Sequence, residues 1–163
     1  MTPPTTLFAE NARLHALLDD KWMQMMLHLT ALDVDAAASA WHDMRDAMRG
    51  HLTYEEDVML EVFDRVDDGE ANTPKLVHGD HVILQRSEAA IDDAFETLQG
   101  TSVDDRRRQM VLLLDVFLRW ARVWEHHTDR EQRTFYAVLD DVLDPSAVEQ
   151  HAEALRAATV PTA

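Results

Sequence analysis

The chain has 163 residues, no cysteine, and 31 acidic against 15 basic side chains, which gives a formal net charge of -16. This length is that of one domain with a substantial core, so we expect a single domain over residues 1–163. The absence of cysteine excludes disulfides, thiolate zinc sites and thiol catalysis, so any metal must be held by nitrogen and oxygen. The negative charge argues against nucleic acids and anionic membranes as partners.

The hydropathy pattern indicates a cytoplasmic protein. No apolar run approaches the length of a membrane span, and residues 1–6 lack the basic and apolar parts of a signal peptide. We therefore expect no membrane insertion and a disordered N-terminus over residues 1–6. The oligomeric state is left open by the sequence.

Prolines and glycines are few and clustered, and the segments between these clusters predict helices. Four long helices joined by short loops favour an all-α, antiparallel, up-down-up-down four-helix bundle. After Pro145, Ser146 and Glu149 have the spacing of a capping box and predict a short fifth helix that covers one end of the bundle. The expected helices span about 7–29, 36–66, 74–100 and 103–143, followed by 145–158.

Two copies of His-x-x-x-Glu lie on helix faces that should be buried. His51 with Glu55, and His127 with Glu131, are four residues apart, so each pair presents an imidazole and a carboxylate on one side of its helix. Apolar residues at steps of three and four continue both faces in each direction. One such pair alone could be a buried hydrogen-bonded couple or could face solvent. Two buried pairs indicate a shared purpose, because unpaired polar groups in a core are costly.

Three further histidines fall at the same height as these pairs. In an antiparallel hairpin, residues equidistant from the turn lie level with each other, and this condition joins His15 with His51, and both His78 and His81 with His127. The expected metal-binding layer therefore consists of His15, His51, Glu55, His78, His81, His127 and Glu131.

The remaining histidines are expected outside this layer. His28 stands near one end of the bundle, and His42 and His151 should be solvated. His126 lies about 100 degrees from the inward stripe of its helix, so it is expected at the surface, with replacement of His127 as the alternative.

Five imidazoles and two carboxylates suit a pair of iron or manganese ions better than a single zinc ion, whose structural sites take four ligands. If both carboxylates and one oxygen bridge the two metals, one metal reaches six ligands and the other only five. The open position, in a mostly apolar pocket, is suited to a diatomic ligand. Trp22, Trp120, Trp124 and Leu84 could shield it, although for each of these residues alone ordinary core packing is the simpler interpretation.

These features resemble the hemerythrin family in its bacterial, cation-binding HHE form. The resemblance covers nearly the whole chain and implies an oxo- or hydroxo-bridged di-iron site, with manganese or zinc as alternatives, in which Glu55 and Glu131 bridge the metals and the five histidines are terminal ligands. It also implies reversible binding or sensing of dioxygen, or less commonly nitric oxide. It is carried by the early histidine, His51-x-x-x-Glu55-Glu56, Asp80-His81-x-x-Leu84, His127-x-x-x-Glu131 and the tail after Asp144-Pro145.

The chain also departs from the family pattern. The acidic-His pair expected early in the first helix aligns with Glu10-Asn11, so Asn11 either replaces or supports His15. Proline is absent five or six residues after each His-x-x-x-Glu, which predicts that both helices continue without a break. His78 and His81 are three residues apart, where the family has four.

Three functions are therefore compared. The leading hypothesis is a di-iron protein that carries or senses dioxygen and is not primarily an enzyme, because a histidine-rich site favours iron(II) and reversible chemistry. The second is a peroxidase, catalase-like or ferroxidase enzyme, for which Glu88 would add a carboxylate. The third is a structural or metal-buffering bundle.

Overall fold

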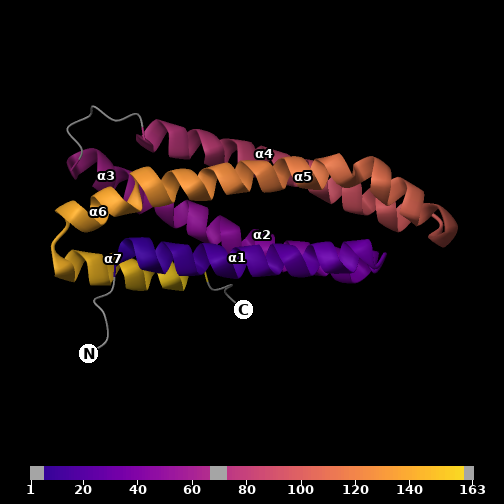
Figure 1. Cartoon of the computed structure of the whole chain (residues 1–163), viewed down its shortest axis with the longest axis horizontal. Coiled ribbons are helices and arrows are strands. Elements are labelled where there is room, and N and C mark those ends of the chain that lie inside the picture. The colour runs from indigo at the N-terminus through magenta and orange to yellow at the C-terminus, as the bar shows by residue number, and fades with distance from the viewer. Residues whose placement is uncertain (1–5, 67–72, 160–163) are drawn as a thin grey trace.

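The computed structural model describes residues 6–66 and 73–159, and within these ranges the chain forms helices and no strands (Figure 1). The all-helical prediction is confirmed. Residues 1–5, most of the segment expected to be disordered, lie outside the described ranges. The elements are α1 Leu7–Thr30, α2 Val34–Tyr54, the π-helical turn η1 Glu55–Met59, α3 Leu60–Val66, α4 Thr73–Gly100, α5 Val103–Thr134, α6 Tyr136–Val142 and α7 Pro145–Ala158.

Side-chain caps fix where several helices begin. The Thr6 hydroxyl accepts from the Ala9 amide, and the Asp33 carboxylate and the Ser102 hydroxyl cap α2 and α5 in the same way. At α7 the expected capping box is wrong. Asp144 is the cap, because its carboxylate accepts from two backbone amides and Pro145 occupies the first helical position.

The long helices pair in space as they follow in sequence. In Figure 1, α1 lies along α2, and α4 lies along α5. The two pairs meet where α2 contacts α4 and α1 contacts α5. Helix α7, which corresponds to the fifth helix expected from the sequence, lies along α1 and α2. Its buried residues Val148, Ala152 and Leu155 pack against apolar side chains of α1, α3 and α6.

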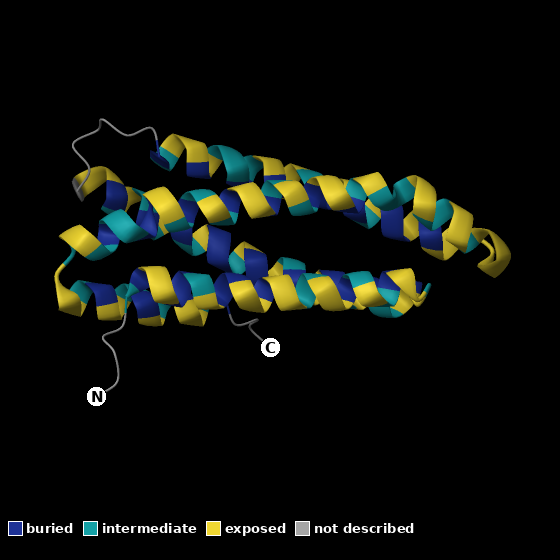
Figure 2. Cartoon of the chain, viewed as in Figure 1, coloured by how far each residue is buried: buried dark blue, intermediate teal, exposed yellow. Residues whose placement is uncertain are grey.

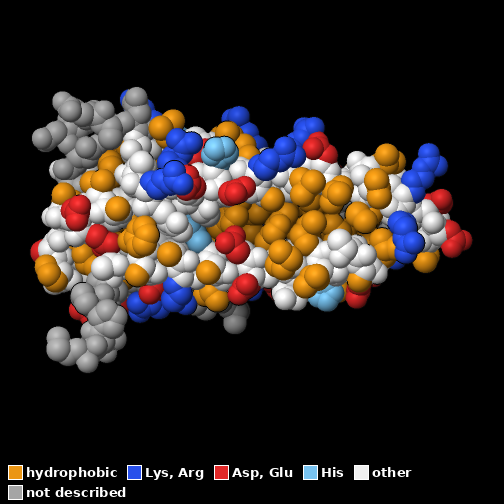
Figure 3. All heavy atoms as spheres, viewed as in Figure 1, with side chains coloured by type: hydrophobic (Ala, Val, Ile, Leu, Met, Phe, Trp, Pro, Cys, Tyr) orange, Lys and Arg blue, Asp and Glu red, His pale blue; other side chains and the backbone are white. Residues whose placement is uncertain are grey.

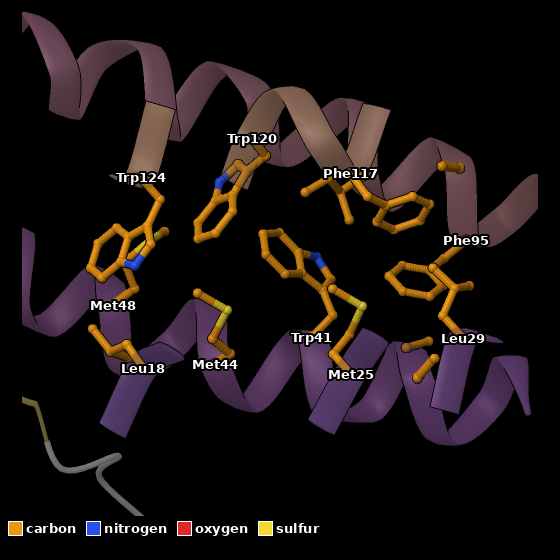
Figure 4. Packing of buried hydrophobic residues seen from close by; sticks show 14 of the residues in the cluster. Leu18, Met25, Leu29, Trp41, Met44, Met48, Phe95, Phe117, Trp120 and Trp124 are labelled. Atoms are coloured by element: carbon orange, nitrogen blue, oxygen red, sulfur yellow. The ribbon is translucent and has the colours of Figure 1, made fainter. Parts of the chain in front are cut away.

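Figure 2 marks the buried residues along each helix. The apolar ones form two clusters, and a layer of buried polar residues lies between them: His15, His51, Glu55, His81, His127 and Glu131. The larger cluster contains Trp41, Trp120 and Trp124 (Figure 4), and the smaller one joins α1, α3, α6 and α7. On α1 the layer lies between Leu14 and Leu18, and on α5 it lies between Trp124 and Phe135.

The helices expected over 36–66 and 103–143 are each interrupted, so the prediction that they continue unbroken is wrong. The first changes to a π-helical turn at Glu55, in which the Leu60 amide bonds to the Glu55 carbonyl five residues earlier. The second breaks at Phe135, with φ -117° and ψ -71°. Neither break contains a proline or a glycine that would predict it from the sequence. Both breaks are stabilised by tertiary packing, because Phe63 beyond the first stacks on Phe135 with ring centroids 5.0 Å apart.

Candidate metal centre

Six of the seven expected ligands meet in the polar layer. Each helix of the two pairs contributes: His15 from α1, His51 from α2, His81 from α4, and His127 and Glu131 from α5. Glu55 begins the π-helical turn η1 that follows α2. All six residues are at most 2% exposed. Two overlapping groups of four, sharing His127 and Glu131, have ligand atoms within 4.8 Å of one another. The cluster can therefore hold metal.

The two glutamates divide the four histidines into two pairs. Oε1 of Glu55 is 3.2 Å from Nε2 of His51, and Oε2 of Glu131 is 3.3 Å from Nε2 of His15. The other oxygens face the opposite pair: Oε2 of Glu55 is 3.3 Å from Nε2 of His81, and Oε1 of Glu131 is 3.4 Å from Nε2 of His127. Each carboxylate thus spans both halves of the cluster.

Several of these inward-facing atoms have no hydrogen-bond partner within the described part of the chain. They include Oε2 of Glu55, Oε1 of Glu131, and Nε2 of both His81 and His127, all fully buried. The Nε2 atoms of His15 and His51 face each other at 3.1 Å, a contact in which at most one nitrogen can donate to the other. Unsatisfied buried donors and acceptors are costly. A cation at this position would satisfy them, and imidazole and carboxylate are ligands of iron, manganese and zinc.

His78 lies outside the cluster. Its side chain is 59% exposed, and its Nδ1 lies 2.8 Å from Oε2 of Glu56. His78 has the height along α4 that its distance from the turn predicts, but the rotation of the helix directs it outward, three residues from His81. The structure therefore brings together four histidines instead of the expected five.

Glu56 connects to the cluster from behind His81. Its Oε1 lies 2.5 Å from Nδ1 of His81, whose Nε2 faces the two carboxylates. A proton held on Nδ1 leaves the Nε2 lone pair free for a metal, which is the usual role of a carboxylate behind a ligand histidine. Among the four histidines of the cluster, His81 alone has such a partner within the described ranges, since Nδ1 of His15, His51 and His127 is buried and unpaired.

The other candidates occupy clear positions. Asn11 supports the centre, because its amide donates to Oε2 of Glu131 at 3.3 Å while His15 occupies the cluster. His126 is exposed and does not replace His127. Glu88 is buried outside the cluster, where it pairs with Arg49.

Tyr136 is a member of the site that the sequence did not reveal. It follows the break at Phe135, is fully buried, and its hydroxyl donates to Oε1 of Glu55 at 2.5 Å. Its position depends on the change of helix direction between α5 and α6. A sequence signal was absent because a tyrosine in this place resembles ordinary core.

Burial and charge together decide which groups of the metal-free cluster hold protons. Burial lowers the pKa of His51 and, more strongly, of His127, so both stay neutral and can donate to a metal. Burial would also lower the pKa of His81, but its contacts with Glu131 and Glu55 outweigh this effect and raise the pKa to about 10. Burial opposes ionisation of Glu131, yet its contacts with His15 and His81 hold the pKa of the carboxyl well below its usual range.

In the described part of the chain, no helix combines the length and apolar character needed to cross a membrane. No family model matches the chain, and neither a curated protein nor a solved structure matches it. The chemical assignment of the cluster therefore rests on its own residues and distances.

Proposed function

We propose that this protein is a hemerythrin-like di-iron protein that binds dioxygen, as a carrier or a sensor, in an antiparallel up-down-up-down four-helix bundle. The observation that carries the proposal is the division of both carboxylates between two histidine pairs. Glu55 faces His51 with one oxygen and His81 with the other, and Glu131 likewise reaches both pairs. Two carboxylates that each face two separate pairs of nitrogens are suited to two metal ions.

If two metal ions bind, the residues present would supply four donors to each. His15 and His51 with one oxygen from each glutamate would form the first set, and His81 and His127 with the remaining oxygens would form the second. One shared oxygen would bring each ion to five ligands of the usual six. A di-iron centre with open positions supplies reversible binding of a diatomic molecule, and the apolar surroundings exclude water from it.

What this chain contributes is positioning and protection. Asn11 and Tyr136 each donate a hydrogen bond to one of the bridging glutamates, and Trp124 covers the side of the layer next to His15 and His127. These contacts fix the orientation of the carboxylates before a metal enters. Nitric oxide, which is also a diatomic ligand of iron(II), would compete with dioxygen for the same open position.

A second candidate function is a di-iron enzyme that turns over peroxide. The observation that favours it is the exposure of His78 outside the cluster, which leaves fewer histidines for the two carboxylates than the sequence predicts. Oxygen donors stabilise oxidised metals, so a smaller share of histidine favours irreversible chemistry.

The first experiment is metal analysis of freshly purified protein, combined with visible absorption spectra. Spectra are recorded in air, after dithionite reduction, and after dioxygen is readmitted and then removed again under vacuum. We expect two irons per chain and absorption bands that follow the dioxygen pressure in both directions. Bands that do not reverse, together with turnover of added peroxide, would favour the enzyme instead.

Two variants test the ligand set. His81→Ala should lose iron, whereas His78→Ala, three residues away on the same helix, should keep both irons and the wild-type spectrum. Zinc alone, or a single metal without oxygen-dependent bands, would contradict the di-iron proposal and leave a structural or metal-buffering bundle.

A further inference from the structure

Trp41, Trp120 and Trp124 belong to the larger apolar cluster next to the polar layer, and Trp22, the fourth tryptophan of the chain, packs against that cluster. Trp22 comes from α1, Trp41 from α2, and Trp120 and Trp124 from α5. Figure 4 shows Trp124, Trp120 and Trp41 following one another along the core between the helix pairs. These large side chains fill the core, and the contacts between their rings suggest a second role beyond packing.

Three of the indoles form a continuous line that begins at the candidate metal centre. The Trp124 ring lies against two cluster histidines, with centroids 5.1 Å from His15 and 5.4 Å from His127. Trp120 is stacked on Trp124, with ring centroids 5.8 Å apart and an interplanar angle of 11°. Trp22 is stacked on Trp120, with ring centroids 4.6 Å apart and an interplanar angle of 21°.

The line ends at the surface. Trp124 and Trp120 are buried, whereas Trp22 is only partly buried and lies on the outer side of the core. Figure 3 shows a band of apolar side chains on the face between α1 and α5. Because Trp22 is partly exposed, a molecule in solution can approach this end of the line, while the other end contacts the cluster.

Indole is among the most easily oxidised side chains, and an electron passes readily between aromatic rings in contact. The indole N–H groups of Trp124 and Trp120 have different surroundings. The indole N–H of Trp124 donates to Oδ1 of Asp19 at 2.7 Å, so a carboxylate can stabilise positive charge or accept the proton when this ring is oxidised. The N–H of Trp120 is buried without a partner among the described residues, so an oxidised Trp120 has no local base. Trp120 should therefore pass charge on instead of retaining it.

We propose that Trp22, Trp120 and Trp124 form an electron-transfer route between the buried centre and the protein surface. The proposal rests on the proposed function for the redox-active metal at its inner end. A one-electron oxidant at the surface takes one electron from Trp22. Trp120 then reduces the oxidised Trp22, and Trp124 in turn reduces the oxidised Trp120. The last electron comes from a reduced iron ion, which becomes oxidised by one unit. Only electrons move along the line. If the oxidised Trp124 donates its indole proton to Asp19, the proton returns when the ring is reduced.

Trp41 provides a matched control within the same cluster. It contacts Trp120 at 5.6 Å and Trp22 at 6.3 Å, but it forms no ring contact with Trp124 or with the cluster histidines in the described structure. Trp41 is thus a side branch. Replacing it removes an equally large buried indole without interrupting the line.

The test uses flash-generated tris(bipyridine)ruthenium(III) as a one-electron oxidant in solution, with transient absorption of the tryptophan radical as the signal. Wild type, Trp120→Phe and Trp41→Phe are compared, each metal-free and loaded anaerobically with iron(II). Metal content and circular dichroism are measured first to confirm that each variant is folded and loaded.

In the wild type and in Trp41→Phe, iron(II) should shorten the lifetime of the tryptophan radical several-fold, because an electron from the metal centre reduces the radical. Trp120→Phe should keep its iron but lose this shortening. Equal lifetimes in loaded Trp120→Phe and loaded wild type would overturn the route, as would an equal loss in Trp41→Phe. Failure of iron to bind would be seen in the metal analysis before any flash and would overturn both proposals, whereas iron that binds without reversible dioxygen binding would contradict the proposed function alone.

Discussion

The hydroxyl of Tyr136 donates a 2.5 Å hydrogen bond to Oε1 of Glu55, a residue 81 positions earlier in the chain. Both residues begin a new element, since Glu55 starts the π-helical turn and Tyr136 starts α6 after the break at Phe135. Two irregularities in different helices thus meet at one carboxylate. Burial, followed by the charge of Glu55, raises the pKa of Tyr136 well above its usual value, so at neutral pH the phenol remains a donor to the carboxylate.

Tyr136→Phe should therefore destabilise the metal-free protein. The substitution keeps the ring but leaves a buried carboxylate oxygen with one partner fewer, and hydrogen bonds to charged groups contribute about 1.5–3 kcal/mol. The measurement is the free energy of unfolding in urea, with a chelator present. Tyr54→Phe is the control, because its hydroxyl bonds to His151 in a partly buried place, and should cost about 0.5–1.5 kcal/mol. A loss at Tyr136 no greater than at Tyr54 would contradict this account.

Glu56→Ala should weaken metal binding without removing a ligand. Glu56 holds Nδ1 of His81 and so fixes the tautomer that presents Nε2 to a metal. Removing such a carboxylate typically lowers metal affinity about 10- to 100-fold. Affinity is measured by competition with a chromophoric chelator. Glu61→Ala, which removes an exposed carboxylate paired with Arg65, should leave the affinity unchanged. If the two variants behave alike, Glu56 does not orient His81.

Much of the fold and the centre could be predicted from helical periodicity. The His-x-x-x-Glu spacing predicts His51, Glu55, His127 and Glu131 on buried faces, and equal distance from the turn predicts His15 and His81 at the same height. These arguments succeed because height along a helix and position around it follow directly from residue number. They fail at His78, where three residues of separation rotate the side chain far enough to reach solvent.

The breaks and their consequences could not be predicted in the same way. The π-helical turn at Glu55 and the break at Phe135 have no local proline or glycine signal, and both are fixed by packing between residues distant in sequence, such as Phe63 on Phe135. Tyr136 reaches Glu55 only because of them. Glu56 was visible as part of the motif, but its contact with His81 requires knowing how α4 lies beside η1.

Gly50→Ala should destabilise the protein through a backbone clash. A Cβ built at Gly50 would lie 2.0 Å from the carbonyl oxygen of Ala158, at the end of α7. Backbone must move to relieve this contact, so we expect a net loss of about 1–3 kcal/mol. Gly79→Ala is the matched control, because nothing lies within 4 Å of its Cβ position, and its gain in helix propensity should stabilise α4 by about 0.5–1 kcal/mol. Unfolding in urea measures both. Stabilisation by Gly50→Ala would show that α7 does not pack against α2 in this way.

The stability of the metal-free protein should be greatest near pH 6.5 and fall on both sides. Burial lowers the folded-state pKa values of His51 and His127 below 6.5, so on the acidic side the unfolded chain binds protons that the native cluster does not. Each residue should contribute a slope of up to about 1.4 kcal/mol per pH unit there. His81 acts in the opposite direction. Its pKa is raised to about 10, so its stabilisation is complete below 6.5 and is lost as the pH rises through about 10.

Urea unfolding at a series of pH values, with metal removed by a chelator, tests this profile. His127→Gln should reduce the acid-side slope, because one buried neutral imidazole is gone, and His81→Gln should flatten the alkaline side. His126→Gln, which changes an exposed neighbour of His127, should leave both slopes unchanged. A wild-type stability that rises steadily from pH 6.5 to 9 would mean that His81 does not hold its proton between Glu55 and Glu131. In that case the metal-free cluster would carry a different distribution of charge from the one its geometry indicates.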